Sequence, residues 1–221
     1  MSDPLALVIA FLYVSVVLAI SEVLRRSIRL SIDLTRKFVH IAVGMIAFPL
    51  VLLFQSWQLA IIPSLAFIVV NYVSYRRQIF AGMETGARGQ LGTVYFPISF
   101  SILIPLLWSQ PALLVASLMP LTWGDAFAAL LGQRCGAHKF TILGQTRSLE
   151  GSSAMFVFGL LAVFLTLLFF AQSITTSFFL ALVVALCASV VEAFSPFGTD
   201  NLTVPLSSAF VLVTLNAMIG K

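Results

Sequence analysis

Acidic and basic side chains occur together in one stretch of this apolar sequence, between Trp123 and Ser152. Asp125 stands near the start of the stretch, inside an apolar run, and Glu150 stands near its end. Basic side chains and flexible glycines lie between the two acids, namely Arg134, His138, Lys139, Arg147, Gly132, Gly136 and Gly144. Basic side chains and backbone N–H groups bind phosphates, and carboxylate oxygens bind Mg²⁺. The stretch therefore predicts one half of a site for a phosphate compound and a metal ion.

The composition indicates which elements must position these residues. Of the 221 residues, 60% are hydrophobic and 9% are charged. In a typical soluble domain roughly half of the residues are hydrophobic and roughly a quarter are charged. A helix that crosses a bilayer needs about 20 mostly apolar residues. The candidate spans are Pro4–Leu24, Phe38–Phe54, Trp57–Tyr75, Val94–Trp108, Pro111–Leu131, Ser153–Ala171, Thr176–Phe194 and Val204–Gly220. We expect an all-α bundle of about eight transmembrane helices that forms a single domain over residues 1–221.

The charged residues are sorted between the two sides of the membrane. Three loops, at residues 25–37, 76–93 and 132–152, contain 11 of the 12 Lys and Arg residues, and alternating spans place these loops on one side. By the positive-inside rule this side is cytoplasmic, so the net charge of +4 reflects topology and does not indicate a nucleic-acid partner. The loop Ser195–Thr203 falls on the same side, and the acids other than Asp3 lie in these four loops or in the span ends that adjoin them. This sorting favours an enzyme at the cytoplasmic face of the plasma membrane or an equivalent bilayer, since a transporter places polar groups near the midplane.

A basic motif marks the start of the second span. Arg36 and His40 are four residues apart and Lys37 and His40 are three apart, so on a helix they share one face. Arg36 and Lys37 could be interfacial anchors. A histidine one turn inside the membrane edge needs a partner, and it could accept a proton or donate to a phosphate.

Small residues surround the two acids of the central stretch. Ala128, Ala129 and Gly132 follow Asp125 at the spacings i+3, i+4 and i+7, which gives a helix face that a ligand or another helix can approach. At the other end, Ser148 or Ser152 could cap the sixth span, with Glu150 and Gly151 in its first turn. A helix N-terminus is also an anion site, so capping does not exclude phosphate binding.

Further acids flank the loop between the last two spans. Glu192 lies near the end of the seventh span, and Asp200 and Asn201 precede the eighth. Asp200 and Asn201 could form only a turn, or they could be ligands. Polar residues around the second cytoplasmic loop are weaker candidates: Asn71, Tyr75, Glu84, Arg88 and Gln90.

Together these motifs resemble those of the CTP-dependent lipid kinases of the phytol, farnesol and dolichol kinase family. Order and spacing match over residues 36–205, and the short chain is more similar to phytol-kinase-like members than to the longer dolichol kinases. The matching residues are Arg36, Lys37, His40, Gly44, Gly124, Asp125, Ala129, Gly132, Gly136, Ser148, Glu150, Gly151, Ser152, Glu192, Asp200, Asn201 and Pro205. The run Gln145-Thr146-Arg147 departs from the family, whose members often carry lysine there, and it leaves open which base binds phosphate.

The resemblance implies that CTP and Mg²⁺ bind at the cytoplasmic face and that a membrane isoprenoid alcohol receives the phosphate, with release of CDP. It implies Asp125, with Glu150 or Asp200, as the Mg²⁺ ligands. His40 or Glu192 would accept the hydroxyl proton. Residues expected to bind the nucleotide are Arg36, Lys37, Lys139, Arg147, Ser148, Gly151 and Asn201. The alternatives are a CTP-dependent diacylglycerol kinase, a CDP-lipid synthase and, more distantly, a membrane transporter.

Overall fold

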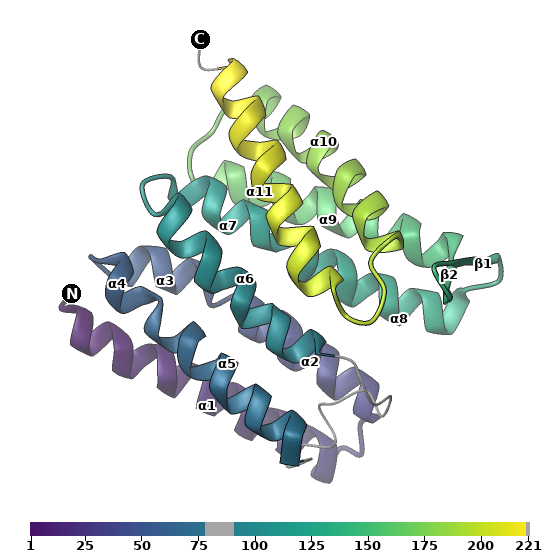
Figure 1. Cartoon of the computed structure of the whole chain (residues 1–221), viewed down its shortest axis with the longest axis horizontal. Coiled ribbons are helices and arrows are strands. Elements are labelled where there is room, and N and C mark those ends of the chain that lie inside the picture. Colours follow the sequence, from purple (N-terminus) through teal and green to yellow (C-terminus); the bar gives the residue numbers. More distant parts are fainter. Residues whose placement is uncertain (78–90, 220–221) are drawn as a thin grey trace. The chain divides into compact units, whose positions relative to one another are not determined.

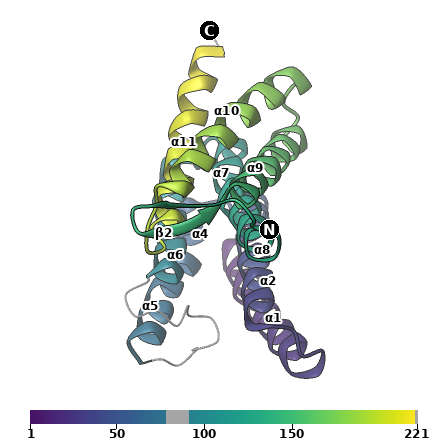
Figure 2. The same ribbon diagram turned by 90° about the vertical axis from the view of Figure 1, so that its right-hand side faces the viewer.

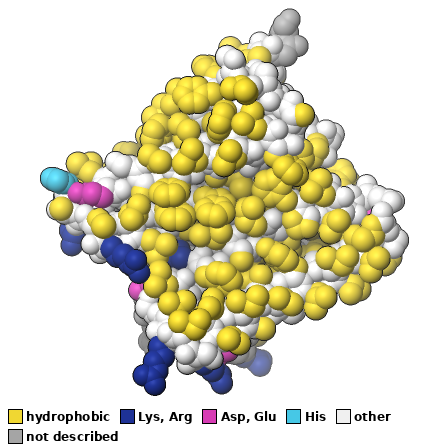
Figure 3. Space-filling model, turned by 180° about the vertical axis from the view of Figure 1, so that it is seen from behind, with side chains coloured by type: hydrophobic (Ala, Val, Ile, Leu, Met, Phe, Trp, Pro, Cys, Tyr) yellow, Lys and Arg dark blue, Asp and Glu magenta, His cyan; other side chains and the backbone are white. Residues whose placement is uncertain are grey.

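Helices dominate the computed structural model, which describes residues 1–77 and 91–219 (Figure 1). Within these residues seven helical stretches are long and apolar enough to cross a membrane, and Gly92–Leu107 is a shorter apolar helix of 16 residues. Hydrophobic side chains cover most of the face in Figure 3. The expected all-α membrane bundle of about eight spans is confirmed, and the protein is an integral, multi-pass membrane protein. The candidates Glu84, Arg88 and Gln90 lie outside the described residues.

The chain divides into two units, of which the first is Met1–Trp108. Its helices are α1 (Asp3–Ser27), α2 (Ile32–Gly44), α3 (Ala47–Leu53), α4 (Trp57–Ala60), α5 (Ile62–Arg77) and α6 (Gly92–Leu107). Helix α1 packs against α2 and α3, and α5 packs against α6. Two of the spans are interrupted shortly before a proline, α2–α3 before Pro49 and α4–α5 before Pro63. Proline has no N–H to donate to the carbonyl four residues earlier, which explains both interruptions.

Asp3, at the start of α1, holds the turn between α3 and α4. Its carboxylate accepts hydrogen bonds from the backbone N–H of Gln55 at 2.6 Å and of Ser56 at 3.2 Å, and from the Ser56 hydroxyl. We expect Asp3→Ala to lower the thermal midpoint in detergent by a few degrees, because these donors lose their acceptor. Ser2→Ala is the control, since the Ser2 side chain makes no capping bond to α1. Equal midpoints for both variants would show that the Asp3 contacts contribute nothing.

The second unit, Ser109–Lys221, contains the central acidic stretch. Its elements are α7 (Pro111–Met119), the π-helical turn η1 (Pro120–Asp125), α8 (Ala126–Cys135), β1 (Lys139–Ile142), β2 (Gln145–Ser148), α9 (Leu149–Phe169), α10 (Ile174–Ala193) and α11 (Asp200–Ile219). One span consists of α7, η1 and α8. All side chains from Leu113 to Met119 are buried, and α7 packs against α9 and α11. Asp125 is therefore placed by a buried helix that is apolar on all sides.

The turn η1 interrupts the regular helix between α7 and α8 and ends at Asp125. It begins at Pro120, which cannot donate the α-helical hydrogen bond. A π-helical turn contains an extra residue, so the side chains after it are rotated about the helix axis. Gly124 allows this turn to lie close to α9, because a Cβ at Gly124 would be 2.7 Å from Sδ and 2.9 Å from the carbonyl oxygen of Met155. The direction of Asp125 thus depends on a local irregularity and a close helix contact.

A β-hairpin forms in the segment 132–152, where the sequence predicted only a loop. Strands β1 and β2 are antiparallel, with Lys139 opposite Ser148 and Ile142 opposite Gln145. Leu143 and Gly144 form the two-residue turn, and both have positive φ, 47° and 76°, as a type I′ turn requires. Figure 2 shows the hairpin reaching from α8 and α9 toward the segment that joins α10 to α11. The hairpin gives Lys139, Arg147 and Ser148 defined positions.

Candidate active site

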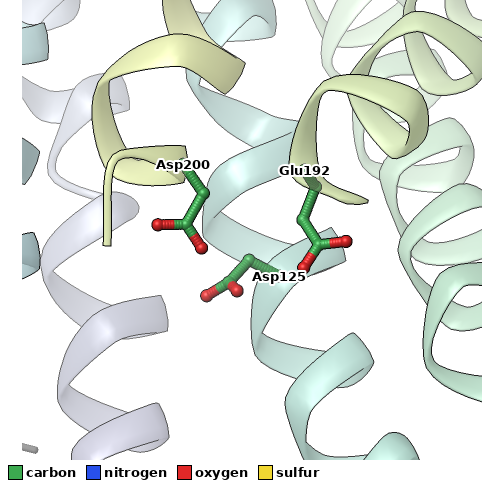
Figure 4. A group of neighbouring side chains, drawn as sticks. All are labelled: Asp125, Glu192 and Asp200. Atoms are coloured by element: carbon green, nitrogen blue, oxygen red, sulfur yellow. The ribbon is translucent and has the colours of Figure 1, made fainter. Parts of the chain in front are cut away.

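Three buried carboxylates converge in the second unit (Figure 4). Asp125 ends η1, Glu192 lies in the last turn of α10 and Asp200 begins α11; they are 8%, 3% and 8% exposed, respectively. One carboxylate oxygen from each residue lies within 4.8 Å of the others. Buried carboxylates this close together require cationic partners. A set of three hard oxygen ligands fits Mg²⁺, which binds through carboxylates and substrate phosphates and keeps several waters.

Asp200 is oriented by the start of its own helix. The N-terminal end of α11 favours its negative charge through the helix dipole. Its Oδ1 accepts hydrogen bonds from the backbone N–H and the side-chain amide of Asn201, both at 3.0 Å. The same amide donates to the carbonyl of Gly198 at 3.2 Å. Asn201, predicted to bind the nucleotide, therefore contacts and orients a member of the carboxylate cluster.

Glu192 is joined to the hairpin by Arg147. Nη1 of Arg147 is 2.8 Å from Oε1 of Glu192. Nη2 donates to the backbone carbonyl of Glu192 at 3.4 Å and to that of Ser195 at 3.2 Å. These carbonyls belong to the C-terminal end of α10 and the residues that follow it, where the helix dipole favours a cation. One guanidinium thus contacts both the carboxylate cluster and the end of its helix.

A cavity of about 440 Å³ lies beside the cluster, a volume within the range of small-molecule sites. It is lined by Asp125, Ala128, Ala129, Gly132, Gln133, Lys139, Thr146, Arg147, Ser148, Gly151, Ser152 and Glu192. The helix face of Asp125, Ala128, Ala129 and Gly132 was predicted from spacing, and the structure confirms that these four residues share the cavity wall. The cavity therefore brings carboxylates and basic side chains together with a wall of small residues.

Glycines bring α8 against the start of α9 at this wall. Ser148 is the N-cap of α9, and its Oγ accepts a hydrogen bond from the N–H of Gly151 at 3.1 Å, which confirms the predicted cap. A Cβ added at Gly132 or Gly151 would lie 3.2 or 3.1 Å from the same Oγ. At Gly136 a Cβ would lie 2.2 Å from the carbonyl oxygen of Gly132. Larger residues here would separate α8 from α9 and change the shape of the cavity.

Glu150 occupies a different place from the three clustered acids. Its Oε1 is 2.7 Å from Nδ1 of His138, and it accepts a hydrogen bond from the His138 backbone N–H at 3.2 Å. In the first turn of α9 its charge is also favoured by the helix dipole. The acid that the structure groups with Asp125 and Asp200 is Glu192, which the sequence suggested only as a proton acceptor. One sequence feature could have indicated that Glu192 joins the cluster, namely its position just before the short connection that leads to Asp200.

The candidates near the N-terminus lie in α2 of the first unit. Arg36 forms an ion pair with Asp33, with Nη2 3.5 Å from Oδ1. Lys37 is buried. The ring of His40 lies 5.1 Å from the ring of Phe96 in α6, measured between centroids. The proposed roles of Arg36, Lys37 and His40 stay predictions.

The fold and the site define a multi-pass membrane protein in which a buried cluster of three carboxylates lies beside a cavity lined by basic side chains. A phytol kinase from Synechocystis sp. is 31% identical over 219 residues, which cover 94% of this chain and 90% of the relative. Probable chloroplastic phytol kinases from Triticum aestivum and Oryza sativa subsp. japonica are each 30% identical, and the matches cover 67% and 62% of their lengths. No family model and no solved structure matches the chain. The chain belongs to the phytol kinase family, and by enzyme class it is a lipid kinase.

Proposed function

We propose that this enzyme transfers the terminal phosphate of CTP to the hydroxyl group of a membrane isoprenoid alcohol of the phytol, geranylgeraniol, farnesol or polyprenol type. The products would be the isoprenoid monophosphate and CDP. The names of the relatives support the acceptor class, and the sequence resemblance supports CTP as donor. The observation that carries the proposal is the cluster of Asp125, Glu192 and Asp200 beside a cavity that also presents Lys139 and Arg147.

Phosphoryl transfer requires in-line placement and charge stabilisation more than covalent chemistry from the protein. Asp125, Glu192 and Asp200 would hold Mg²⁺, which when bound neutralises negative charge on the triphosphate and the leaving group. Lys139 lines the cavity from β1, and its ammonium would donate to phosphate oxygens. The start of α9 lines the same cavity, and its helix dipole would favour an anion there.

The hydroxyl proton requires an acceptor, for which the sequence suggested His40 or Glu192. The carboxylate of Glu192 already contacts Arg147 at 2.8 Å and belongs to the acidic cluster. We therefore assign Glu192 to the metal set in place of Glu150, and His40 stays the predicted proton acceptor. The sorting of basic loops supports a cytoplasmic position for the site.

The test is an assay of the purified protein in detergent with γ-labelled CTP and Mg²⁺. Phytol, geranylgeraniol, a long polyprenol, diacylglycerol and a lipid phosphate, phosphatidate, are supplied in parallel, and protein with Asp125→Asn controls for contaminating kinases. We expect label in an isoprenoid monophosphate, together with released CDP and dependence on Mg²⁺.

Three results would contradict the proposal in different ways. Label in diacylglycerol alone would indicate a glycerolipid kinase. Release of labelled pyrophosphate without labelled lipid would indicate a CDP-lipid synthase. No consumption of CTP with any acceptor would exclude both kinds of CTP enzyme.

A further inference from the structure

Arg147 was expected to bind phosphate, but its guanidinium donors are directed elsewhere. Nη1 contacts the Glu192 carboxylate at 2.8 Å, and Nη2 donates to two backbone carbonyls at the C-terminal end of α10, that of Glu192 in its last turn and that of Ser195 just after it. Nε is buried and has no hydrogen-bond partner. The contacts of Arg147 therefore point to the end of α10.

We propose that Arg147 is a positioning residue for the metal site: it fixes the carboxylate of Glu192 and thereby sets the affinity of the cluster for a divalent cation. The proposal rests on the proposed function only in assigning a metal to the three carboxylates. In this proposal Arg147 orients a metal ligand, whereas Lys139, the other basic residue that lines the cavity, binds phosphate.

The first reason is the geometry that the metal requires. Mg²⁺ demands near-ideal octahedral coordination, so a ligand that moves between rotamers lowers affinity. Glu192 has one more rotatable bond than Asp125 or Asp200, and its orientation needs an external restraint. The planar guanidinium provides a directional hydrogen bond to Oε1 and is itself fixed by the two carbonyls.

The second reason is charge. Three carboxylates with oxygens within 4.8 Å repel one another while no metal is bound. A cation 2.8 Å from one of them reduces this repulsion and allows the cluster to keep its shape before the metal arrives. Groups that hold metal ligands in this way typically change metal affinity by about 10–100-fold when they are removed.

The third reason is the position of Arg147 in the hairpin. It lies opposite Phe140 in the β ladder, and the next pair is Lys139 with Ser148, both of which line the cavity. The contacts of Arg147 with α10 thus hold the strand pair that carries Lys139. A lysine at position 147 could still pair with Glu192, but it could not also reach both carbonyls in the same planar arrangement.

Binding of Mn²⁺ to the full-length protein in detergent, followed by electron paramagnetic resonance without nucleotide, tests the proposal. We expect Arg147→Ala to weaken Mn²⁺ binding about 10–100-fold and Arg147→Lys to recover part of the loss. Lys139→Ala should bind Mn²⁺ as the wild type does. At saturating metal, the KM for CTP should rise more in Lys139→Ala than in Arg147→Ala, because Lys139 itself would contact the phosphates whereas Arg147 only holds the strand pair that carries it. Thermal melts establish that each variant is folded.

Unchanged Mn²⁺ affinity in both Arg147 variants, combined with a raised KM for CTP, would overturn the proposal and return Arg147 to phosphate binding. A wild-type protein that phosphorylates an isoprenoid alcohol but binds no Mn²⁺ would also overturn it, while the proposed function stands. Conversely, Mn²⁺ binding that depends on Arg147 in a protein without kinase activity would support the positioning role and contradict the proposed function.

Discussion

Asp125→Asn is expected to reduce CTP-dependent turnover by about 10³-fold, because it removes an anionic oxygen ligand from the metal cluster. Asp125 is the acid placed by the buried span of α7, η1 and α8, and it lines the cavity with Lys139. Neutral amides bind Mg²⁺ weakly compared with carboxylates. The assay is label transfer from γ-labelled CTP to the best acceptor at several Mg²⁺ concentrations.

The variant should stay folded, because asparagine has nearly the shape of aspartate and reduces the negative charge of the cluster. In EDTA its thermal midpoint should equal or exceed that of the wild type. Added Mg²⁺ should raise the midpoint of the wild type, since ligands that bind the native state stabilise it, and should have little effect on the variant. Comparing the thermal midpoints of each protein in EDTA and in Mg²⁺ therefore distinguishes loss of metal binding from loss of the fold.

Asp3→Asn is the matched control for this experiment. It makes the same chemical change in the first unit, where Asp3 contacts the turn at Gln55 and Ser56. Turnover at a temperature well below its midpoint should be that of the wild type. Wild-type activity in Asp125→Asn would remove Asp125 from the metal site.

Gly124→Ala is expected to lower turnover more than tenfold and also to lower the thermal midpoint. The added Cβ would lie 2.7 Å from Sδ and 2.9 Å from the carbonyl oxygen of Met155, so η1 and α9 must separate. Overpacking of this kind costs about 1–3 kcal/mol. Because Asp125 is the next residue, the same displacement moves its carboxylate away from Glu192 and Asp200.

Gly159→Ala provides the comparison on the same pair of elements. Its Cβ would lie 3.8 Å from Pro120, an ordinary contact, and alanine favours a helix over glycine by about 1 kcal/mol. We expect wild-type turnover and an equal or higher midpoint. A second substitution, Met155→Ala, should restore only part of the activity of Gly124→Ala, because the close backbone carbonyl stays in place. If Gly124→Ala and Gly159→Ala behaved alike, the close approach at Gly124 would not be what positions Asp125.

The spans were predictable because hydropathy and length alone decide whether a segment can cross a bilayer. The Ser148 cap was predictable for a similar reason, since it depends on a few adjacent residues. The π-helical turn was not, because a proline such as Pro120 can break, kink or widen a helix according to the packing around it. The hairpin was missed because its turn, Leu143-Gly144, lacks the usual Asn-Gly or Asp-Gly signal and lies among other glycines.

The acids of the site were all named from the sequence, but their grouping was not. Glu150 and Glu192 are both next to span ends, and local sequence does not tell which of them faces Asp125. The choice is made by tertiary packing: α9 turns Glu150 toward His138, whereas α10 carries Glu192 to Asp125 and Asp200. The contact between Asn201 and Asp200 could not be predicted from local sequence either, since it depends on how the chain enters α11.

The three clustered carboxylates come from three different spans, and this has a consequence for biogenesis. Membrane proteins are synthesised from the N-terminus, so Asp125 is made before α10 and α11. The complete ligand set exists only after the last helix has inserted and packed, because Asp200 begins that helix. A nascent or truncated chain without α11 therefore lacks the complete carboxylate cluster, and the cation site that we propose could form only once this unit is assembled.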